Sequence, residues 1–173
     1  MIKKISLSII IFILYTAQLH ALIEVDITRG NLDPLPVAVS PLSADKNTND
    51  KLSKELKINK IGHKISEVVE NNLKNSGLFN PLNKDAFLQK PDIAHLKPRF
   101  EDWSLIKAQA LITGKVLIKN DKLKVEFRLW DVLAAREILA LSFTTVPSNW
   151  RRVGHIITDK VYERLTGEKG YFD

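Results

Sequence analysis

The clearest strand in the sequence is KLKVEFRLW, at residues 122–130. Apolar side chains alternate with polar ones along it, and successive side chains of a strand point to opposite faces. The alternation therefore predicts one buried and one exposed face, as in an antiparallel sheet. Segments 110–118 and 137–145 are also strand-like, and a turn at 119–121 joins the first of them to residues 122–130. The buried face is expected to carry Leu123, Val125, Phe127 and Leu129.

Two amphipathic helices are predicted around these strands. Apolar residues recur at helical spacing over 58–75, and Gly77 ends the pattern. They recur in a last helix, with Ser148 or Asn149 as its N-cap and Gly167 as its stop. Shorter segments add a buried strand and a weak helix, at 37–39 and 100–109. The order of elements predicts an α/β fold, a two-layer mixed sheet flanked by helices.

The first 21 residues have the layout of a secretory signal peptide. Lys3 and Lys4 precede an apolar run at Ile5–Tyr15, and the small residue Ala21 ends the polar stretch that follows. Because this run is shorter than the roughly 20 residues of a spanning helix, we expect cleavage after Ala21 and no membrane span in the mature chain. Cleavage would lower the formal net charge from +6 by the two lysines. The small excess that remains in an exported chain gives little support to a nucleic-acid partner.

The sequence contains no strong catalytic constellation. It has no cysteine, which excludes disulfides, thiol nucleophiles and cysteine-based zinc sites. His155 and Asp159 stand four residues apart on the last helix and could pair, but catalysis or metal binding would need further converging ligands. Glu24 and Asp26 share one side of a possible strand, where solvent-exposed carboxylates are favoured over a glycosidase pair. We therefore expect no enzyme, no cofactor and no metal.

The three tryptophans have different expected roles. Trp103 and Trp150 stand at helix starts beside apolar stripes, which predicts core positions. Trp130 falls on the outer face of its strand. Either another element packs on Trp130, or this side chain anchors an interface.

Several segments carry a family resemblance. They are PVAVSP at 36–41, NLKNSGLFNP at 72–81, FRLWD at 127–131 and a set of residues from Arg152 to Gly170. Residues 23–30 add a strand-like arm directly after the predicted cleavage site. Taken in order, these segments resemble the amino-terminal domain of the TolB family, part of the Tol–Pal cell-envelope system.

The resemblance implies the division of the chain. Residues 1–21 are the signal peptide, residues 22–33 a mobile amino-terminal arm, and residues 34–166 the TolB-like α/β domain. Residues 167–173 are expected to begin a linker to a β-propeller that the family carries and this chain lacks. The polar loop at 43–57 is longer than the usual connection of the family.

The resemblance also implies a periplasmic, non-enzymatic interaction domain that supports outer-membrane integrity and envelope invagination during cell division. The arm is expected to bind the carboxyl-terminal domain of TolA, and Pal is expected to bind mainly through the propeller. A strand-forming arm can add to the edge of a partner's sheet. The expected partner-binding residues are Leu22, Ile23, Glu24, Val25, Asp26, Ile27, Thr28, Arg29 and Gly30, the last two forming a hinge.

Two alternatives remain at this point. The arm could be an edge strand docked on its own domain, and docking and release could be the two states of a switch. The protein could also be a stand-alone periplasmic regulator of cell-wall synthesis with a similar fold.

Overall fold

The computed structural model describes residue 23, residues 33–45 and residues 57–173. The predicted signal peptide, most of the arm and most of the loop at 43–57 lie outside these residues. The described elements are β1 (Leu35–Val39), β2 (Ser43–Ala44), α3 (Ile58–Asn75), β3 (Phe79–Pro81), η1 (Lys84–Ala86), α4 (Pro91–Ala94), α5 (Phe100–Leu105), β4 (Ala110–Lys119), β5 (Lys122–Asp131), β6 (Arg136–Thr145), η2 (Pro147–Asn149) and α6 (Trp150–Thr166).

The described strands form one mixed sheet in the order β3-β1-β4-β5-β6, with β2 also paired to β4. β1 is parallel to β3 and β4, whereas β4, β5 and β6 are successively antiparallel. The predicted hairpin is therefore confirmed. Its turn residues Asn120 and Asp121 both have positive φ, at 52° and 58°, the combination that a tight two-residue hairpin turn requires.

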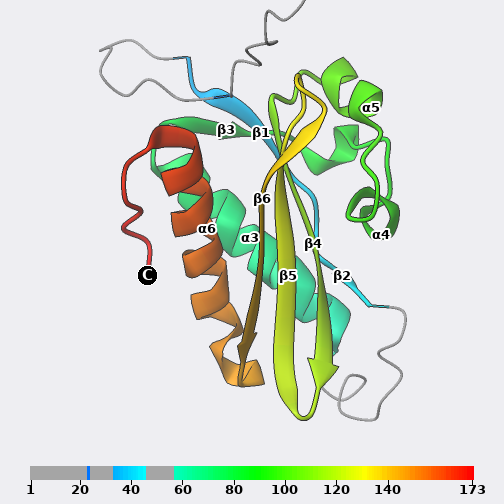
Figure 1. Ribbon diagram of the computed structural model, residues 1–173, viewed down its shortest axis with the longest axis vertical. Coiled ribbons are helices and arrows are strands. Elements are labelled where there is room, and N and C mark those ends of the chain that lie inside the picture. Colours follow the sequence, from blue (N-terminus) through cyan, green and yellow to red (C-terminus); the bar gives the residue numbers. More distant parts are fainter. Residues whose placement is uncertain (1–22, 24–32, 46–56) are drawn as a thin grey trace, which may run out of the picture.

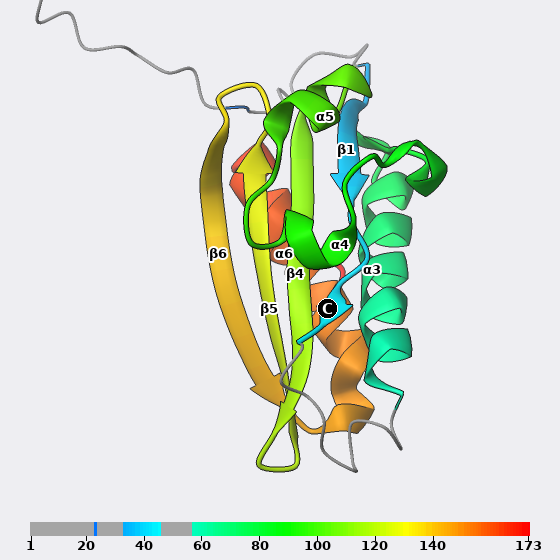
Figure 2. The same ribbon diagram turned by 90° about the vertical axis from the view of Figure 1, so that its right-hand side faces the viewer.

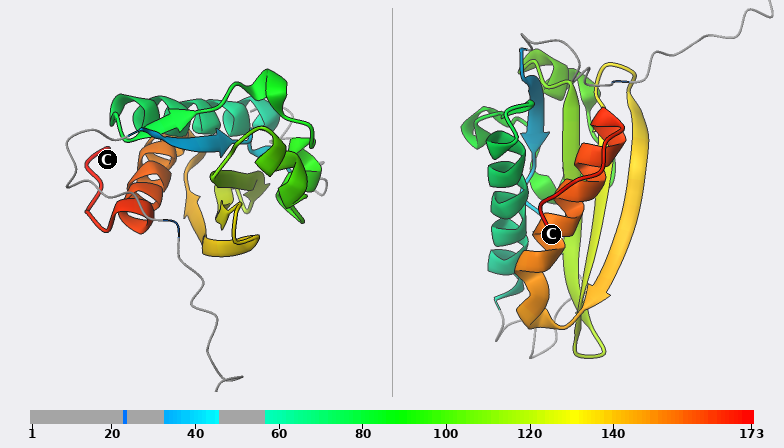
Figure 3. Two further views of the ribbon diagram at one scale, coloured as in Figure 1. Left: turned by 90° about the horizontal axis from the view of Figure 1, so that it is seen from above. Right: turned by 90° about the vertical axis from the view of Figure 1, so that its left-hand side faces the viewer.

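The predicted mixed sheet flanked by helices is confirmed, and the helices lie on both faces of the sheet. α3 and α6 pack against each other and against the sheet, and α4 and α5 lie on the other side of the strands from α6 (Figures 1 and 2). The view from above in Figure 3 shows the same separation of α6 from α4 and α5. The short helix α4 is not among the predicted elements. Pro91 begins this short helix at a position where its missing N–H costs nothing.

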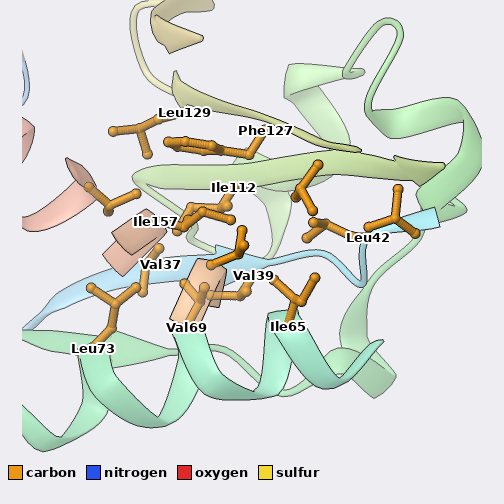
Figure 4. Packing of buried hydrophobic residues seen from close by; sticks show 14 of the residues in the cluster. Val37, Val39, Leu42, Ile65, Val69, Leu73, Ile112, Phe127, Leu129 and Ile157 are labelled. Atoms are coloured by element: carbon orange, nitrogen blue, oxygen red, sulfur yellow. The ribbon is translucent and has the colours of Figure 1, made fainter. Parts of the chain in front are cut away.

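The main core fills the space between the sheet and the pair α3 and α6. Val37, Ile112 and Phe127 reach it from the sheet, and Ile65 and Ile157 reach it from the two helices (Figure 4). All five side chains are at most 1% exposed. The predicted inward face of β5 is thus confirmed. α3 packs so closely that a Cβ atom on its Gly62 would lie 2.2 Å from the backbone oxygen of Leu42, which explains a glycine inside this helix.

A smaller outer cluster lies on the opposite face of the sheet, under α4 and α5. Gln89, which is 4% exposed, holds this layer together. Its Oε1 accepts hydrogen bonds from the indole of Trp103 at 3.1 Å and from the Arg99 backbone at 2.9 Å. Its Nε2 donates to the Lys97 carbonyl at 3.0 Å. The buried members of the outer cluster are Ala38, Ala94, Trp103, Ala108, Leu111, Trp130 and Val132.

The ends of the long helices follow the prediction only in part. α3 spans the predicted residues, and α6 ends at Gly167, whose φ of 77° is the left-handed conformation that glycine supplies. Asn149, one of the two predicted candidates, is the N-cap of α6, but its side chain makes no capping hydrogen bond. It ends the short 3₁₀ turn η2, and its amide donates to the Thr145 hydroxyl at 3.3 Å. Among the described residues no helix is long and apolar enough to cross a membrane.

Candidate partner-binding site

The amino-terminal end of the predicted arm is fixed to the domain at Ile23. The Ile23 backbone N–H donates a 3.2 Å hydrogen bond to Oδ2 of Asp131, at the end of β5. The Ile23 side chain packs against the main core. Of the nine expected partner-binding residues, Ile23 is the described one, and it docks on its own domain. Leu22 and residues 24–30 lie outside the described residues, and the carboxylates of Glu24 and Asp26 are therefore outside them too.

Asp131 is the residue that connects the arm to the sheet. It is 2% exposed, and its second oxygen, Oδ1, accepts a 2.9 Å hydrogen bond from the Ala134 backbone. One carboxylate therefore holds both the β5–β6 turn and the amino-terminal end of the arm. The same turn presents Leu133, which is 69% exposed. Sequence reasoning did not assign a role to Asp131, although an acidic residue that ends a buried strand before a turn is a usable signal.

His155 and Asp159 are not brought together as a pair. Nδ1 of His155 lies 2.9 Å from the side-chain nitrogen of Asn72, in α3. The Asp159 carboxylate instead accepts hydrogen bonds from the backbone N–H groups of Phe172 at 2.8 Å and Asp173 at 3.2 Å. These contacts give both side chains roles in packing α6 rather than in chemistry.

The tryptophans occupy three different environments. Trp103 lies in the outer cluster and is 1% exposed, as predicted. Trp130 is covered as well, because Phe100 of α5 packs edge-on against it with ring centroids 5.9 Å apart, and its indole donates to the Thr113 hydroxyl at 2.8 Å. Of its two expected roles, packing by another element is therefore the one the structure shows. Trp150 is only half-buried against the main core.

A small pocket of about 90 Å³ lies on the outer face of the sheet. Its wall contains a chain of ion pairs, in which Lys115 Nζ lies 2.9 Å from Asp45 and 3.5 Å from Glu126. The hydrogen bond to Asp45 raises the pKa of Lys115, and the hydrogen bond from Lys124 lowers the pKa of Glu126. The pocket is lined by His95, Leu96, Gly114, Lys115, Glu126 and Arg128.

The charged groups around this pocket are paired with one another. Burial lowers the pKa of His95, and the cations Lys115 and Arg128 lower it further. His95 is therefore neutral at pH 7, while the charged neighbours neutralise one another. No serine, threonine or tyrosine is among the lining residues. In the described part of the chain, no group of three or more histidine, aspartate or glutamate side chains is placed to hold a metal ion.

A family model and a similar full-length relative point to the same family. Residues 23–138 match the family model of the TolB amino-terminal domain. The Tol-Pal system protein TolB of Pelagibacter ubique (strain HTCC1062) is 72% identical over 164 residues, which make up 95% of this chain. The chain spans 37% of the length of that relative.

Solved structures are similar at the level of the fold. The crystal structure of TolB from Acinetobacter baumannii matches with a TM-score of 0.62 and 21% identity, over 86% of this chain and 32% of that chain. The carboxyl-terminal domain of LpoB from Escherichia coli matches with a TM-score of 0.45 and 12% identity, over 68% of this chain and 86% of that chain. The second likeness is too low to carry an argument.

Proposed function

Because this chain belongs to the TolB amino-terminal domain family, we propose that it is a non-enzymatic protein-interaction domain of the Tol–Pal system. It acts in the periplasm, after removal of residues 1–21. There it supports outer-membrane integrity and the invagination of the envelope during cell division. Its arm, residues 22–30, binds the carboxyl-terminal domain of TolA.

The observation that carries this proposal is the docking of Ile23. Its backbone N–H bonds to Asp131 and its side chain contacts the main core, so the domain holds the arm at Ile23, near the amino-terminal end of the arm. The arm sequence LIEVDIT places Ile23, Val25 and Ile27 at alternate positions. Such a segment can add to a sheet edge, where backbone hydrogen bonds give affinity and alternate side chains give specificity.

Docking and partner binding compete in this proposal. A partner that pairs with the arm as a strand needs its backbone N–H groups, and one of them is bonded to Asp131 in the docked state. The apparent affinity for the partner is therefore lower when a larger fraction of the molecules has its arm docked. The domain thereby regulates how available its own arm is.

A titration against the TolA carboxyl-terminal domain tests the proposal. The mature chain is compared with a variant that lacks Leu22–Gly30, and with a double variant, Val25→Asp and Ile27→Asp. Both variants are expected to lose binding while still unfolding cooperatively. A matched control, Glu24→Gln with Asp26→Asn, keeps the apolar alternation and is expected to bind within about threefold of the unchanged chain. Unchanged affinity in the deletion variant would overturn the proposal.

Pal provides a second test. We place Pal binding mainly in the part of the longer relatives that this chain does not contain, so this chain is expected to bind Pal weakly or not at all. A tight complex between the two in the same titration would contradict that assignment.

A further inference from the structure

The residues after α6 do not leave the domain but turn back along the helix. Gly167 reverses the chain with a φ of 77°, and residues 168–173, which we call the exit strap, run beside α6 toward its first turns (Figure 3, right). The family resemblance implies the start of a linker in this place, at 167–173.

Three kinds of contact hold the exit strap. The Asp159 carboxylate accepts the backbone N–H groups of Phe172 and Asp173, at 2.8 and 3.2 Å. Arg152 forms a forked ion pair with the Asp173 carboxylate, with nitrogen–oxygen distances of 3.0 and 3.1 Å. This pairing lowers the pKa of Asp173. The ring of Tyr162 meets the Phe172 ring edge-on, with centroids 5.8 Å apart.

Gly170 makes the closest approach of the exit strap to α6. A Cβ atom at this position would lie 2.3 Å from Oδ1 of Asp159 and 2.4 Å from the Asp159 Cα. Any side chain there would push the strap away from the helix. The glycine is thus required by the contact itself, since its φ is not in the left-handed region.

We propose that the exit strap is a latch, closed by Asp159 and Gly170, that fixes the place and direction in which the polypeptide of longer family members leaves this domain. Following chain would begin beside the first turns of α6, next to Arg152. A fixed exit restricts how a following domain can be oriented, whereas a flexible linker would leave it free. The latch does not depend on which partner the arm binds.

Limited trypsin digestion measures the latch directly. The bond after Lys169 lies inside the strap, and cleavage releases Gly170–Asp173, which mass spectrometry detects. Cleavage of a bond in a folded protein follows the population of its open form. Rates are therefore normalised to a free peptide of residues 165–173, which carries the Gly170→Ala substitution when that variant is measured. Backbone ¹⁵N relaxation of residues 170–172 provides a second readout in the intact chain.

The expected result is protection of Lys169 in the unchanged chain, with ¹⁵N order parameters close to those of α6. Asp159→Ala and Gly170→Ala are each expected to raise the normalised cleavage rate about tenfold or more and to make residues 170–172 mobile. Gly170→Ala lies outside the helix, so it decides the outcome if Asp159→Ala fails to fold. The control Glu163→Ala removes an exposed ion pair with Lys160 on the same helix and should leave protection intact.

Three results would overturn the latch. In the first, the unchanged chain is cleaved at the rate of the free peptide. In the second, Gly170→Ala leaves both protection and relaxation unchanged. In the third, Glu163→Ala opens the strap as much as Gly170→Ala does.

Discussion

A Cβ atom on Gly154 of α6 would lie 2.8 Å from Cγ1 of Val68 of α3. Real Cβ atoms essentially never come that close to another heavy atom, so the two long helices meet at a glycine because nothing larger fits. Gly154→Ala is expected to lower the free energy of unfolding by about 1–2 kcal/mol, because overpacking outweighs the gain of about 1 kcal/mol in helix propensity. Chemical denaturation measures the change.

A double-mutant cycle with Val68→Ala identifies the cause. Removing the Val68 methyl groups takes away the 2.8 Å contact but leaves the Val68 Cβ 2.9 Å from the new Cβ. The loss in the double variant should therefore be smaller than the sum of the two single losses without vanishing. A Gly154→Ala variant that is more stable than the unchanged chain would show that the helices do not meet in this way.

Gln89→Ala should destabilise the outer layer. The substitution leaves the Trp103 indole and the Arg99 backbone N–H without their acceptor, and buried donors without partners are costly. We expect a loss of about 2–3 kcal/mol in the free energy of unfolding, together with a shift in tryptophan fluorescence. As a control, Asn71→Ala on the exposed side of α3 should change stability by less than about 0.5 kcal/mol. Equal effects of the two substitutions would rule out the role given to Gln89.

The ion pairs of Glu126 predict a dependence of stability on pH. Its pKa is lowered in the folded protein, mainly by the hydrogen bond from Lys124, from an ordinary value of 4.5. A lowered carboxyl pKa contributes stability that is fully present above 4.5 and is lost as the pH falls through the folded value. The unchanged chain should therefore exceed Glu126→Gln in stability at pH 6, and this difference should shrink toward pH 3. A difference that stays constant over this range would contradict the assignment.

Asp131→Ala should make the arm more available. The substitution removes the acceptor of the Ile23 N–H, so a larger fraction of molecules has a free arm. In calorimetric titration the affinity for the TolA carboxyl-terminal domain is expected to rise about threefold to tenfold. A synthetic peptide of Leu22–Gly30, which has no domain to dock on, should bind at least as tightly as the unchanged chain. If the Asp131→Ala variant and the peptide both bind more weakly than the unchanged chain, docking does not compete with the partner.

Local patterns in the sequence predicted the main elements well. β5 was predictable because its apolar and polar residues alternate, which places the apolar side chains on one face of a strand. α3 was predictable because its apolar residues recur at helical spacing and Gly77 ends the pattern. The ion pair between Arg152 and Asp173 and the bond from Ile23 to Asp131 were not predictable, because each joins residues far apart in the chain. Trp130 was ambiguous for the same reason. Its cover comes from Phe100, on a helix whose position no local pattern determines.

The expected site was predictable as a segment and not as a set of contacts. The alternation in LIEVDIT indicates a strand-forming segment. The carboxylate that accepts the hydrogen bond from its Ile23 N–H belongs to Asp131, 108 residues away. The linker expected at 167–173 was inferred from the family resemblance, which carries no information about contacts. The bonds from Asp159 to the backbone of residues 172 and 173 depend on how closely Gly170 approaches the helix.

The two apolar clusters lie on opposite faces of one sheet, and this gives the domain unequal resistance to local unfolding. The outer cluster draws most of its cover from the short helices α4 and α5, whereas the main core is covered by α3 and α6, each of more than four turns. Short helices with few buried partners open at lower free energy than long ones. In native-state hydrogen exchange, amides of α4 and α5 should therefore exchange before those of α3. One face of the sheet can lose its cover while the other remains folded.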